Sequence, residues 1–298
     1  MFVAVVSREI ARPTVATTPG RTTGLDLALQ IVAYVVLIVV ALLMFIPFFF
    51  SLTTSIKTAP EASQVNTLTN LLWPDDPTLA AYREVFAADI GRWFFNSAFV
   101  AAIWVVGRAV ADSMAGYAFA RMQFPGRNLI FLMVLSTLMI PAMVTIIPKF
   151  ILLERLNLLD TYGALTIPFL SSAFGIFLMK QFFESIPVEL EEAARVDGAS
   201  RYRMFVQIVL PNAMPALTAL SIFSFQASWN AFLEPLLFIT SPELRTLPLG
   251  LAYFQEAFNF NWPVSMAIAV ITTLPMAIVF LIFQRYFVEG QTTSGIKG

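Results

Sequence analysis

The decisive stretch of this sequence is ALQIVAYVVLIVVALLMFIPFFF, residues Ala28–Phe50, a run of 23 residues without one charged side chain. A helix needs about 20 mainly apolar residues to cross the hydrocarbon core of a bilayer. The rest of the chain has the same character, because 58% of its 298 residues are hydrophobic and only 12% are charged. Soluble domains carry about 25% charged residues. We therefore expect a membrane protein.

Five further segments are long and apolar enough to span a bilayer. They are Trp93–Phe119, Leu129–Leu152, Tyr162–Phe183, Val206–Ile239 and Ser265–Phe287. The predicted fold is an all-α membrane protein with six transmembrane helices in one domain, residues 28–288, between an N-terminal extension (1–27) and a C-terminal tail (289–298). The fifth segment is too long for one straight crossing, so we expect a helix ending near Phe232, then a turn and a short re-entrant or interfacial piece.

The distribution of Lys and Arg predicts the orientation of the spans, because cytoplasmic loops are enriched in both. Eleven basic residues flank one side of the predicted spans: Arg8, Arg12, Arg21, Arg121, Arg127, Lys180, Arg195, Arg201, Arg203, Arg285 and Lys297. Six flank the other side: Lys57, Arg83, Arg92, Lys149, Arg155 and Arg245. Both termini should be cytoplasmic, and no secretory signal is evident.

Several classes of chemistry are excluded by composition. The chain has no Cys and no His, so thiolate or imidazole metal sites and Ser–His or Cys–His nucleophiles are absent. No Gly is followed by Lys, so the chain has no phosphate-binding loop of the G-x-x-x-x-G-K-[ST] kind. Its 18 basic and 19 acidic residues nearly cancel, which argues against a nucleic-acid partner. We expect a non-catalytic protein with no cofactor or metal of its own.

The densest charge lies between the fourth and fifth spans, in SIPVELEEAARVDGASRYRMF, residues 185–205. Its carboxylates fall at the start of a predicted helix, where the helix dipole favours them, and Glu191 is placed to pair with Arg195 one turn later. Gly198 should end this helix, and Ser200 should cap the next one. Leu190, which shares one face with two alanines, begins an apolar stripe suited to a groove on another protein.

An alternative is an amphipathic helix lying on the membrane surface. Such helices usually present Lys or Arg to the lipid headgroups. This segment instead carries five acidic residues between Glu184 and Asp197, which an anionic leaflet repels. The composition therefore favours a protein partner.

The segment also resembles a known motif. Glu192-Ala193-Ala194, then three residues, Gly198, nine more residues and Ile208–Pro211 resemble the EAA loop of ABC-importer permeases, the inner-membrane components of binding-protein-dependent transport systems. Further resemblance, to the MalG-like carbohydrate branch, lies in the pieces Phe95-Asn96-Ser97, Gly116–Arg121, Phe124–Arg127, Trp229-Asn230 and Tyr286–Gly290. It covers the chain from about Ala28 onward.

The resemblance implies a type I ABC importer permease fold in a bacterial or archaeal inner membrane. It implies that a coupling helix seats in a cleft of a separate ATPase through Glu192, Ala193, Ala194, Asp197, Gly198 and Ala199. The implied partners are a second permease subunit, two ATPase subunits that bind ATP and Mg, and an extracytoplasmic substrate-binding protein. The implied cargo is a carbohydrate or related polyol.

Arg108 and Asp112 place two charges near the middle of the second span, where each costs about 2.5–3.5 kcal/mol. They lie one helical turn apart, so the spacing predicts a direct pair. The pair either lines a solute path or only fixes helix packing. A third hypothesis makes it the ion-coupling site of a proton- or ion-coupled secondary transporter.

Prolines interrupt two spans, Pro141 and Pro148 in the third and Pro211 and Pro215 in the fifth. Such breaks border a transport path in some transporters and are static kinks in others. Just after the fifth span's breaks, a group of amides, a carboxylate and an aromatic ring suits the hydroxyls and flat C–H faces of sugars. The members proposed for the translocation path are Gln226, Trp229, Asn230 and Glu234. Trp is also common in interfacial belts.

The predicted outer loop Ser241–Pro263 is rich in aromatic residues. In the maltose-type family the corresponding loop reaches into the substrate-binding protein, so the resemblance implies contact through Tyr253, Phe254, Phe258 and Trp262. A loop merely folded over the outer mouth is the alternative.

Overall fold

The computed structural model describes residues 24–63, 70, 72–257 and 261–292, and every regular element within them is helical. The chain divides into two units, one ending at Phe49 and one beginning at Phe50, and each is described by itself. Helix α1 (Gly24–Ser55) contains the decisive apolar run. Its most apolar window has a mean hydropathy of 3.0, and none of that window is buried. This surface needs lipid or another protein to cover it.

Four helical segments are long and apolar enough to cross a membrane, and two bent helix pairs raise the number to six. The unbent candidates begin with α1 and continue with α5 (Ile90–Arg121), the α8–α9 segment Tyr162–Ser185, and α16 (Trp262–Thr292). The six predicted spans are confirmed if each bent pair is one span. Helix α16 continues past residue 288, where the membrane domain was expected to end.

The third span is broken at Pro141, the first of its two prolines. Helix α6 (Arg127–Ser136) and the 3₁₀ turn η1 (Thr137–Met139) meet α7 (Ala142–Arg155) at an angle of 104°. Pro141 occupies the break, but Pro148 lies inside α7 without interrupting it. The predicted interruption at Pro148 is therefore wrong: losing one backbone donor does not by itself end a helix.

The fifth span bends by 79° between its two prolines. It starts with α11 (Arg201–Met204), a π-helical turn η3 (Phe205–Val209) and α12 (Leu210–Asn212), and continues as α13 (Met214–Trp229). A turn then leads to the short helix α14 (Leu233–Phe238). The predicted helix end, turn and short extra piece are confirmed, with the end three residues earlier than expected.

Helix α5 packs at close range against the fourth span, which consists of α8 (Tyr162–Thr166), η2 (Ile167–Phe169) and α9 (Ala173–Ser185). Glycines allow the approach. A Cβ added at Gly116 would lie 2.8 Å from the Met179 Cβ, and one added at Gly175 would lie 1.9 Å from an Asp112 oxygen. Small residues at helix contacts are typical of membrane bundles. Helix α13 also packs on α5, so these helices form the centre of the second unit.

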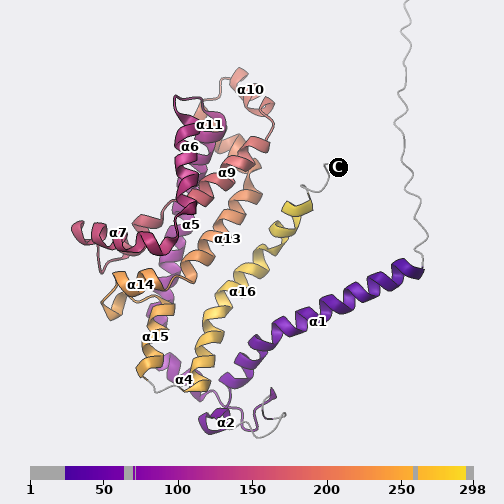
Figure 1. Ribbon diagram of the computed structural model, residues 1–298, viewed down its shortest axis with the longest axis vertical. Helices are drawn as coiled ribbons and strands as arrows, with labels where there is room; N and C mark the ends of the chain where they lie inside the picture. The colour runs from indigo at the N-terminus through magenta and orange to yellow at the C-terminus, as the bar shows by residue number, and fades with distance from the viewer. Residues whose placement is uncertain (1–23, 64–69, 71, 258–260, 293–298) are drawn as a thin grey trace, which may run out of the picture. The chain divides into compact units, whose positions relative to one another are not determined.

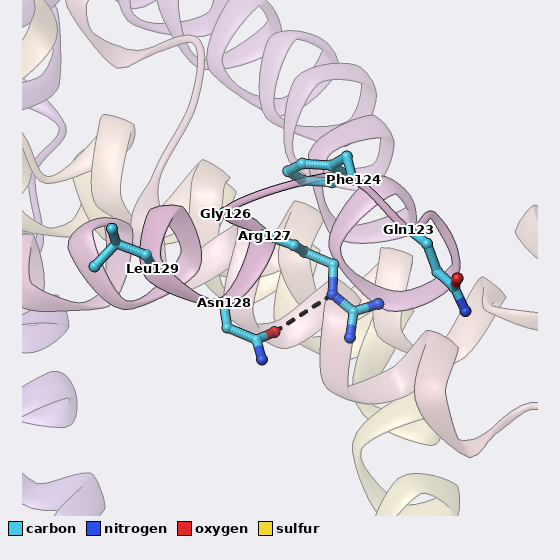
Figure 2. Close-up of a pocket in the computed structure, with 6 residues that line it drawn as sticks. All are labelled: Gln123, Phe124, Gly126, Arg127, Asn128 and Leu129. Atoms are coloured by element: carbon cyan, nitrogen blue, oxygen red, sulfur yellow. Dashed lines mark hydrogen bonds between the residues drawn. The ribbon is translucent and has the colours of Figure 1, made fainter.

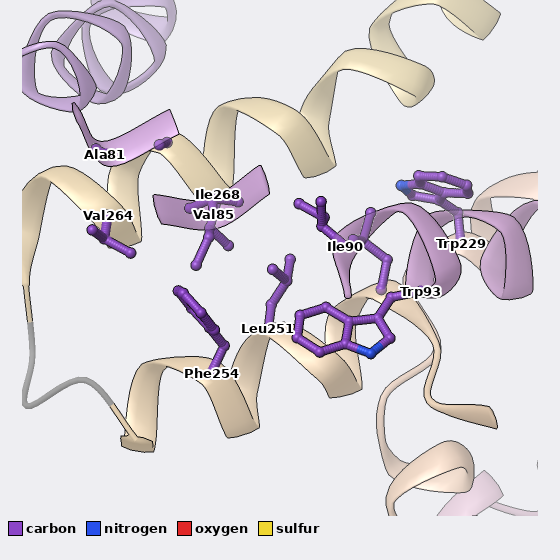
Figure 3. Close-up of a cluster of buried hydrophobic side chains, with 11 residues drawn as sticks. Ala81, Val85, Ile90, Trp93, Trp229, Leu251, Phe254, Val264 and Ile268 are labelled. Carbon is purple, nitrogen blue, oxygen red and sulfur yellow. The ribbon is translucent and has the colours of Figure 1, made fainter. Parts of the chain in front are cut away.

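The two ends of the second unit differ (Figure 1). One end carries α10 (Glu189–Val196) and α11, and the other carries α4 (Ala80–Ala87) and α15 (Leu247–Ala257). The shorter elements α2 (Ala59–Ser63) and η4 (Pro242–Leu244) complete the second unit. In Figure 3, side chains from α4, α5, α13, α15 and α16 meet in one apolar cluster, which includes Trp93, Trp229 and Phe254.

Candidate functional site

The EAA-like segment forms a helix, a sharp turn and a second helix. Helix α10 begins with its acidic residues in the first turn and Arg195 in the last, as the dipole argument predicts. Gly198 has a φ of +81°, a left-handed conformation that glycine adopts at low cost. The Ser200 hydroxyl then accepts a hydrogen bond from the Arg203 N–H, 3.3 Å away, and caps α11. The predicted bend and cap are confirmed.

Much of α10 is exposed. Leu190 is 44% exposed and Val196 is 88% exposed, which is unusual for apolar side chains in a packed protein. Four of the predicted coupling residues are exposed: Glu192, Ala193, Asp197 and Gly198. The other two, Ala194 and Ala199, are half-buried. All six are therefore at least partly accessible in the described part of the chain, and acidic and small apolar residues are both among them. Such a surface fits a groove on a partner.

Glu191 does not pair with Arg195, contrary to the prediction. Its side chain turns inward and is 3% exposed. Its Oε1 lies 2.8 Å from the Arg121 Nε, and its Oε2 accepts a hydrogen bond of 2.9 Å from the Tyr117 hydroxyl. Both partners belong to the last turns of α5. Sequence spacing considers only neighbours on one helix, so it missed partners that lie 70 residues or more earlier.

Next to this end, the turn between α5 and α6 surrounds an open cavity of about 330 Å³ (Figure 2). Gly126 has a φ of +77° there, and Arg127 donates from Nη1 to the Met122 carbonyl at 3.2 Å. In the figure, Arg127 also reaches toward Asn128. These bonds stabilise the turn itself. None of the predicted site residues lines this cavity.

Arg108 and Asp112 do not form the predicted direct ion pair, although both are described. The Arg108 Nε donates to the Phe169 carbonyl at 3.0 Å, and its guanidinium lies 4.5 Å from the centre of the Trp104 ring. Asp112 is fully buried and accepts hydrogen bonds from the Ser171 hydroxyl and from the N–H and hydroxyl of Ser172, at 2.6, 2.9 and 3.0 Å.

These bonds belong to a row of polar side chains along α5 that face the break in the fourth span. One turn before Arg108, the Trp104 indole donates to the Leu165 carbonyl at 2.7 Å. The helix is interrupted at η2 and resumes at Ala173, so backbone groups there lack helical partners. The row supplies those partners. In this structure both intramembrane charges therefore contact the fourth span rather than each other.

The predicted translocation residues are divided by the structure. Trp229 is 1% exposed, its indole donates to the Thr272 carbonyl at 3.0 Å, and its ring stacks on Phe225. It is therefore a packing residue between α13 and α16 and cannot stack on a solute in this structure. Gln226 and Asn230 are exposed, and Glu234 is half-buried.

The predicted receptor-contacting residues are also divided. Tyr253 is 41% exposed beneath the Arg245 guanidinium, which lies 3.9 Å from the ring centre, and Trp262 is 44% exposed. Phe254 is buried in the cluster of Figure 3 against Trp93, so it is unavailable to a partner. Phe258 lies outside the described residues. Eleven residues of the predicted loop form the helix α15.

One carboxylate at the α15 end was missed by sequence reasoning. Asp160, in the turn after α7, accepts hydrogen bonds from the Thr240 and Ser241 N–H groups at 2.9 and 2.8 Å and from the Ser241 hydroxyl. The Ser241 hydroxyl, followed by the Ser241 backbone N–H, lowers the pKa of Asp160 to about 2. Asp160 thereby ties the segment after α14 to the segment before α8.

Comparisons with known proteins agree with the motif. Residues 112–292 match the model of the family described as binding-protein-dependent transport system inner membrane component. The chain is 38% identical over 235 residues to the arabinooligosaccharide transport system permease protein AraQ of Halalkalibacterium halodurans, covering 78% of this chain and 84% of that protein. It is 38% identical over 206 residues to the sn-glycerol-3-phosphate permease protein UgpE of Pectobacterium atrosepticum, covering 68% and 73%.

A solved structure shares the fold as well. A chain of a bacterial ABC transporter that imports the acidic polysaccharide alginate superposes with a TM-score of 0.78 at 26% identity, covering 89% of this chain and 98% of that one. The EAA-like segment and the last four predicted spans lie within the matched family region. The chain belongs to the inner-membrane components of binding-protein-dependent transport systems, the permease subunits of ABC importers.

Proposed function

We propose that this chain forms half of the translocation pore of an ATP-driven importer for a carbohydrate or related polyol. The observation that carries the proposal is the free surface of α10 and its glycine bend, at one end of the closely packed α5, α9 and α13. A short helix joined directly to a spanning segment can pass movement from a soluble motor into the membrane. The chain itself performs no covalent step.

The proposed assembly contains a second permease subunit, two ATPase subunits and an extracytoplasmic solute receptor. The receptor is supported by a related alginate transporter, whose crystal structure is a complex with an alginate pentasaccharide-bound periplasmic protein. ATP and Mg would be held by the ATPase subunits. We place both termini in the cytoplasm, on the side of α10, in accordance with the eleven flanking basic residues there.

The carbohydrate cargo is supported by the named solutes of the relatives, which include arabinooligosaccharides and sulfoquinovosyl glycerol. Gln226, Asn230 and Glu234 remain the proposed contacts, because the two amides are exposed and the carboxylate is only half-buried. The Asn230 side-chain amide donates to the Gln226 backbone carbonyl at 3.0 Å, which leaves its oxygen and its second N–H for a solute hydroxyl. Tyr253 and Trp262 remain proposed receptor contacts.

The rival function, secondary transport through Arg108 and Asp112, is disfavoured by their surroundings. An ion-coupling carboxylate must exchange its proton or ion with water during transport. Asp112 has an exposed fraction of 0% and uses both oxygens for hydrogen bonds to Ser171 and Ser172.

Uptake by proteoliposomes that contain the whole importer tests the proposal. Solute uptake should require ATP on the side of the membrane that carries the ATPase subunits, and a protonophore should leave uptake unchanged. Uptake that continues without ATP and stops with a protonophore would establish the rival function instead.

Two substitutions, one at the bend and one on the exposed part of α10, test the coupling role of this segment. Gly198→Pro cannot adopt a φ of +81° and also removes the N–H that bonds to the Arg195 carbonyl. We expect it to insert but to lose at least tenfold in solute imported per ATP. Glu192→Lys, which reverses an exposed charge on the docking surface, should act in the same direction. Normal coupling in both variants would contradict the role of this segment.

A further inference from the structure

A buried cluster of three side chains joins the coupling segment to α5. Glu191 differs from Glu189 and Glu192 on the same helix, which are both exposed. The Glu191 carboxylate is divided between two residues one turn apart: Oε1 lies 2.8 Å from the Arg121 Nε, and Oε2 accepts from the Tyr117 hydroxyl at 2.9 Å. The Arg121 side chain is only 14% exposed and that of Glu191 only 4%.

The same two residues of α5 also hold the segments on either side of α10. Arg121 donates from Nη2 to the carbonyl of Ile186, three residues before α10 begins. The Tyr117 ring packs edge-on against Phe183 at 6.0 Å and lies 5.0 Å from the Phe205 ring. The end of α9, helix α10 and the start of the fifth span therefore all contact one turn of α5.

This attachment differs in kind from an exposed ion pair. Exposed pairs are weak and mobile because water competes for both groups. A charge-assisted hydrogen bond shielded from water, such as the one from the Tyr117 hydroxyl to the Glu191 Oε2, is stronger and fixes the geometry of its partners. Nearby, Lys180 and Glu184 form an ion pair at 2.7 Å whose side chains are 14% and 41% exposed, and both residues belong to α9. The chain therefore provides an internal comparison between an ion pair that links elements and one that does not.

We propose that Tyr117, Arg121 and Glu191 form a rigid link that makes α5 move with the coupling segment when the ATPase moves it. This inference rests on the proposed function and adds a second route for movement. The first route is covalent and runs from α10 through α11 to α13. The second crosses from α10 to α5, which is distant from it in sequence. Glu191 is thus a positioning residue, because its side chain contacts α5 and is buried away from the docking surface.

Distance measurement between two spin labels tests the link directly. The chain contains no cysteine, so labels go only to introduced sites. Glu189→Cys marks the exposed side of α10, and Met114→Cys marks an exposed position of α5, where Met114 is 57% exposed. In the complete importer the label distance should stay the same with and without bound ATP. A distance that changes on ATP binding in the otherwise unaltered protein would overturn the proposal.

Substitutions then separate linking from simple stability. Tyr117→Phe keeps the ring and removes one hydroxyl, and Glu191→Gln keeps the shape and removes the charge. Both variants should still co-purify with the ATPase subunits, and those importers should still hydrolyse ATP. The distribution of label distances should broaden when ATP binds, and the amount of solute imported per ATP should fall threefold or more. Glu184→Gln, which removes the ion pair within α9 and leaves the contact of Lys180 with the Phe131 ring, should change neither quantity.

The outcomes distinguish this proposal from the proposed function. If the ATPase co-purifies and ATP drives uptake, but Tyr117→Phe and Glu191→Gln import normally, only the link is wrong. If Glu191→Gln does not assemble, the milder Tyr117→Phe decides. Uptake that never depends on ATP removes the proposed function itself.

Discussion

Charged residues within this protein are stabilised by side-chain and backbone groups of other elements. A carboxylate in the middle of a span costs about 2.5–3.5 kcal/mol on insertion scales. Hydrogen bonds to charged groups contribute about 1.5–3 kcal/mol each. Asp112 has three such bonds, from Ser171 and Ser172, so they offset its burial without a direct ion pair to Arg108.

The pH dependence of stability should report on Asp160. Its lowered pKa means that the folded state holds the ionised form more tightly than the unfolded chain does. That stabilisation is complete above about pH 4 and is lost as pH falls toward about 2. Asp160→Asn should therefore lower the melting temperature at neutral pH, and the difference from the unaltered protein should shrink between pH 4 and pH 2.

Thermal unfolding in detergent, followed by tryptophan fluorescence, measures this difference. Asn tolerates the positive φ of 57° at this position, so the substitution removes charge without straining the backbone. Asp76→Asn is the control, since Asp76 is exposed and has no hydrogen bond or ion pair in the described part of the chain. Equal melting curves for Asp160→Asn and the unaltered protein at pH 7 would contradict the argument.

Single residues were predictable from the sequence only where their partners are local. Gly198 and Ser200 act within a few residues of themselves, so the turn and cap were predicted correctly. Glu191 and Arg108 bind groups about 60 to 70 residues away. No helical spacing identifies such partners, and so the sequence suggested neighbours on the same helix instead. Trp229 was assigned to a solute path because its burial against α16 depends on tertiary packing.

Helices were predicted better than contacts, because hydropathy and proline act locally. The spans, the break at Pro141 and the bend near Pro211 follow from composition. The approach of α5 to α9 does not. It depends on Gly107, Gly116 and Gly175, whose role appears only when the facing helix is known. Without these glycines the polar row of α5 could not reach the interrupted backbone opposite it.

Replacement of one contact glycine should therefore weaken the whole helix pair. A Cβ at position 175 would lie 1.9 Å from an Asp112 oxygen and 2.8 Å from the Leu220 Cδ1. Overpacking of this kind costs about 1–3 kcal/mol. We expect Gly175→Ala to lower the melting temperature in detergent clearly. Gly91→Ala, in α5 and with no atom within 4 Å of the added carbon, should leave it unchanged or raise it slightly.

At the scale of the molecule, the second unit has two chemically different ends. One end presents α10 with its bend, and the other carries α4 and α15 with the exposed rings of Tyr253 and Trp262. This polarity is what an importer needs, because the motor and the receptor act on opposite sides of a membrane. The unequal distribution of Lys and Arg predicts which end faces the cytoplasm, and this orientation stays a prediction.

Labelling with a membrane-impermeant maleimide tests this orientation. The cysteine-free chain allows single introduced thiols at Asn128, in the turn of Figure 2, and at Asp76, both of which are exposed. In right-side-out vesicles Asp76→Cys should react and Asn128→Cys should not, and inverted vesicles should reverse the result. Reaction of both thiols from the same side would contradict the proposed topology.

The polar row of α5 also has a consequence for synthesis. Trp104, Arg108 and Asp112 lie about 60 residues before the backbone groups they satisfy. During translation they enter the bilayer first, so the donors and acceptors are in place when the interrupted segment leaves the translocon. In the reverse order, backbone groups of the interrupted segment would enter hydrocarbon before their hydrogen-bond partners were present. The order of the spans along the chain thus protects the interrupted fourth span during membrane insertion.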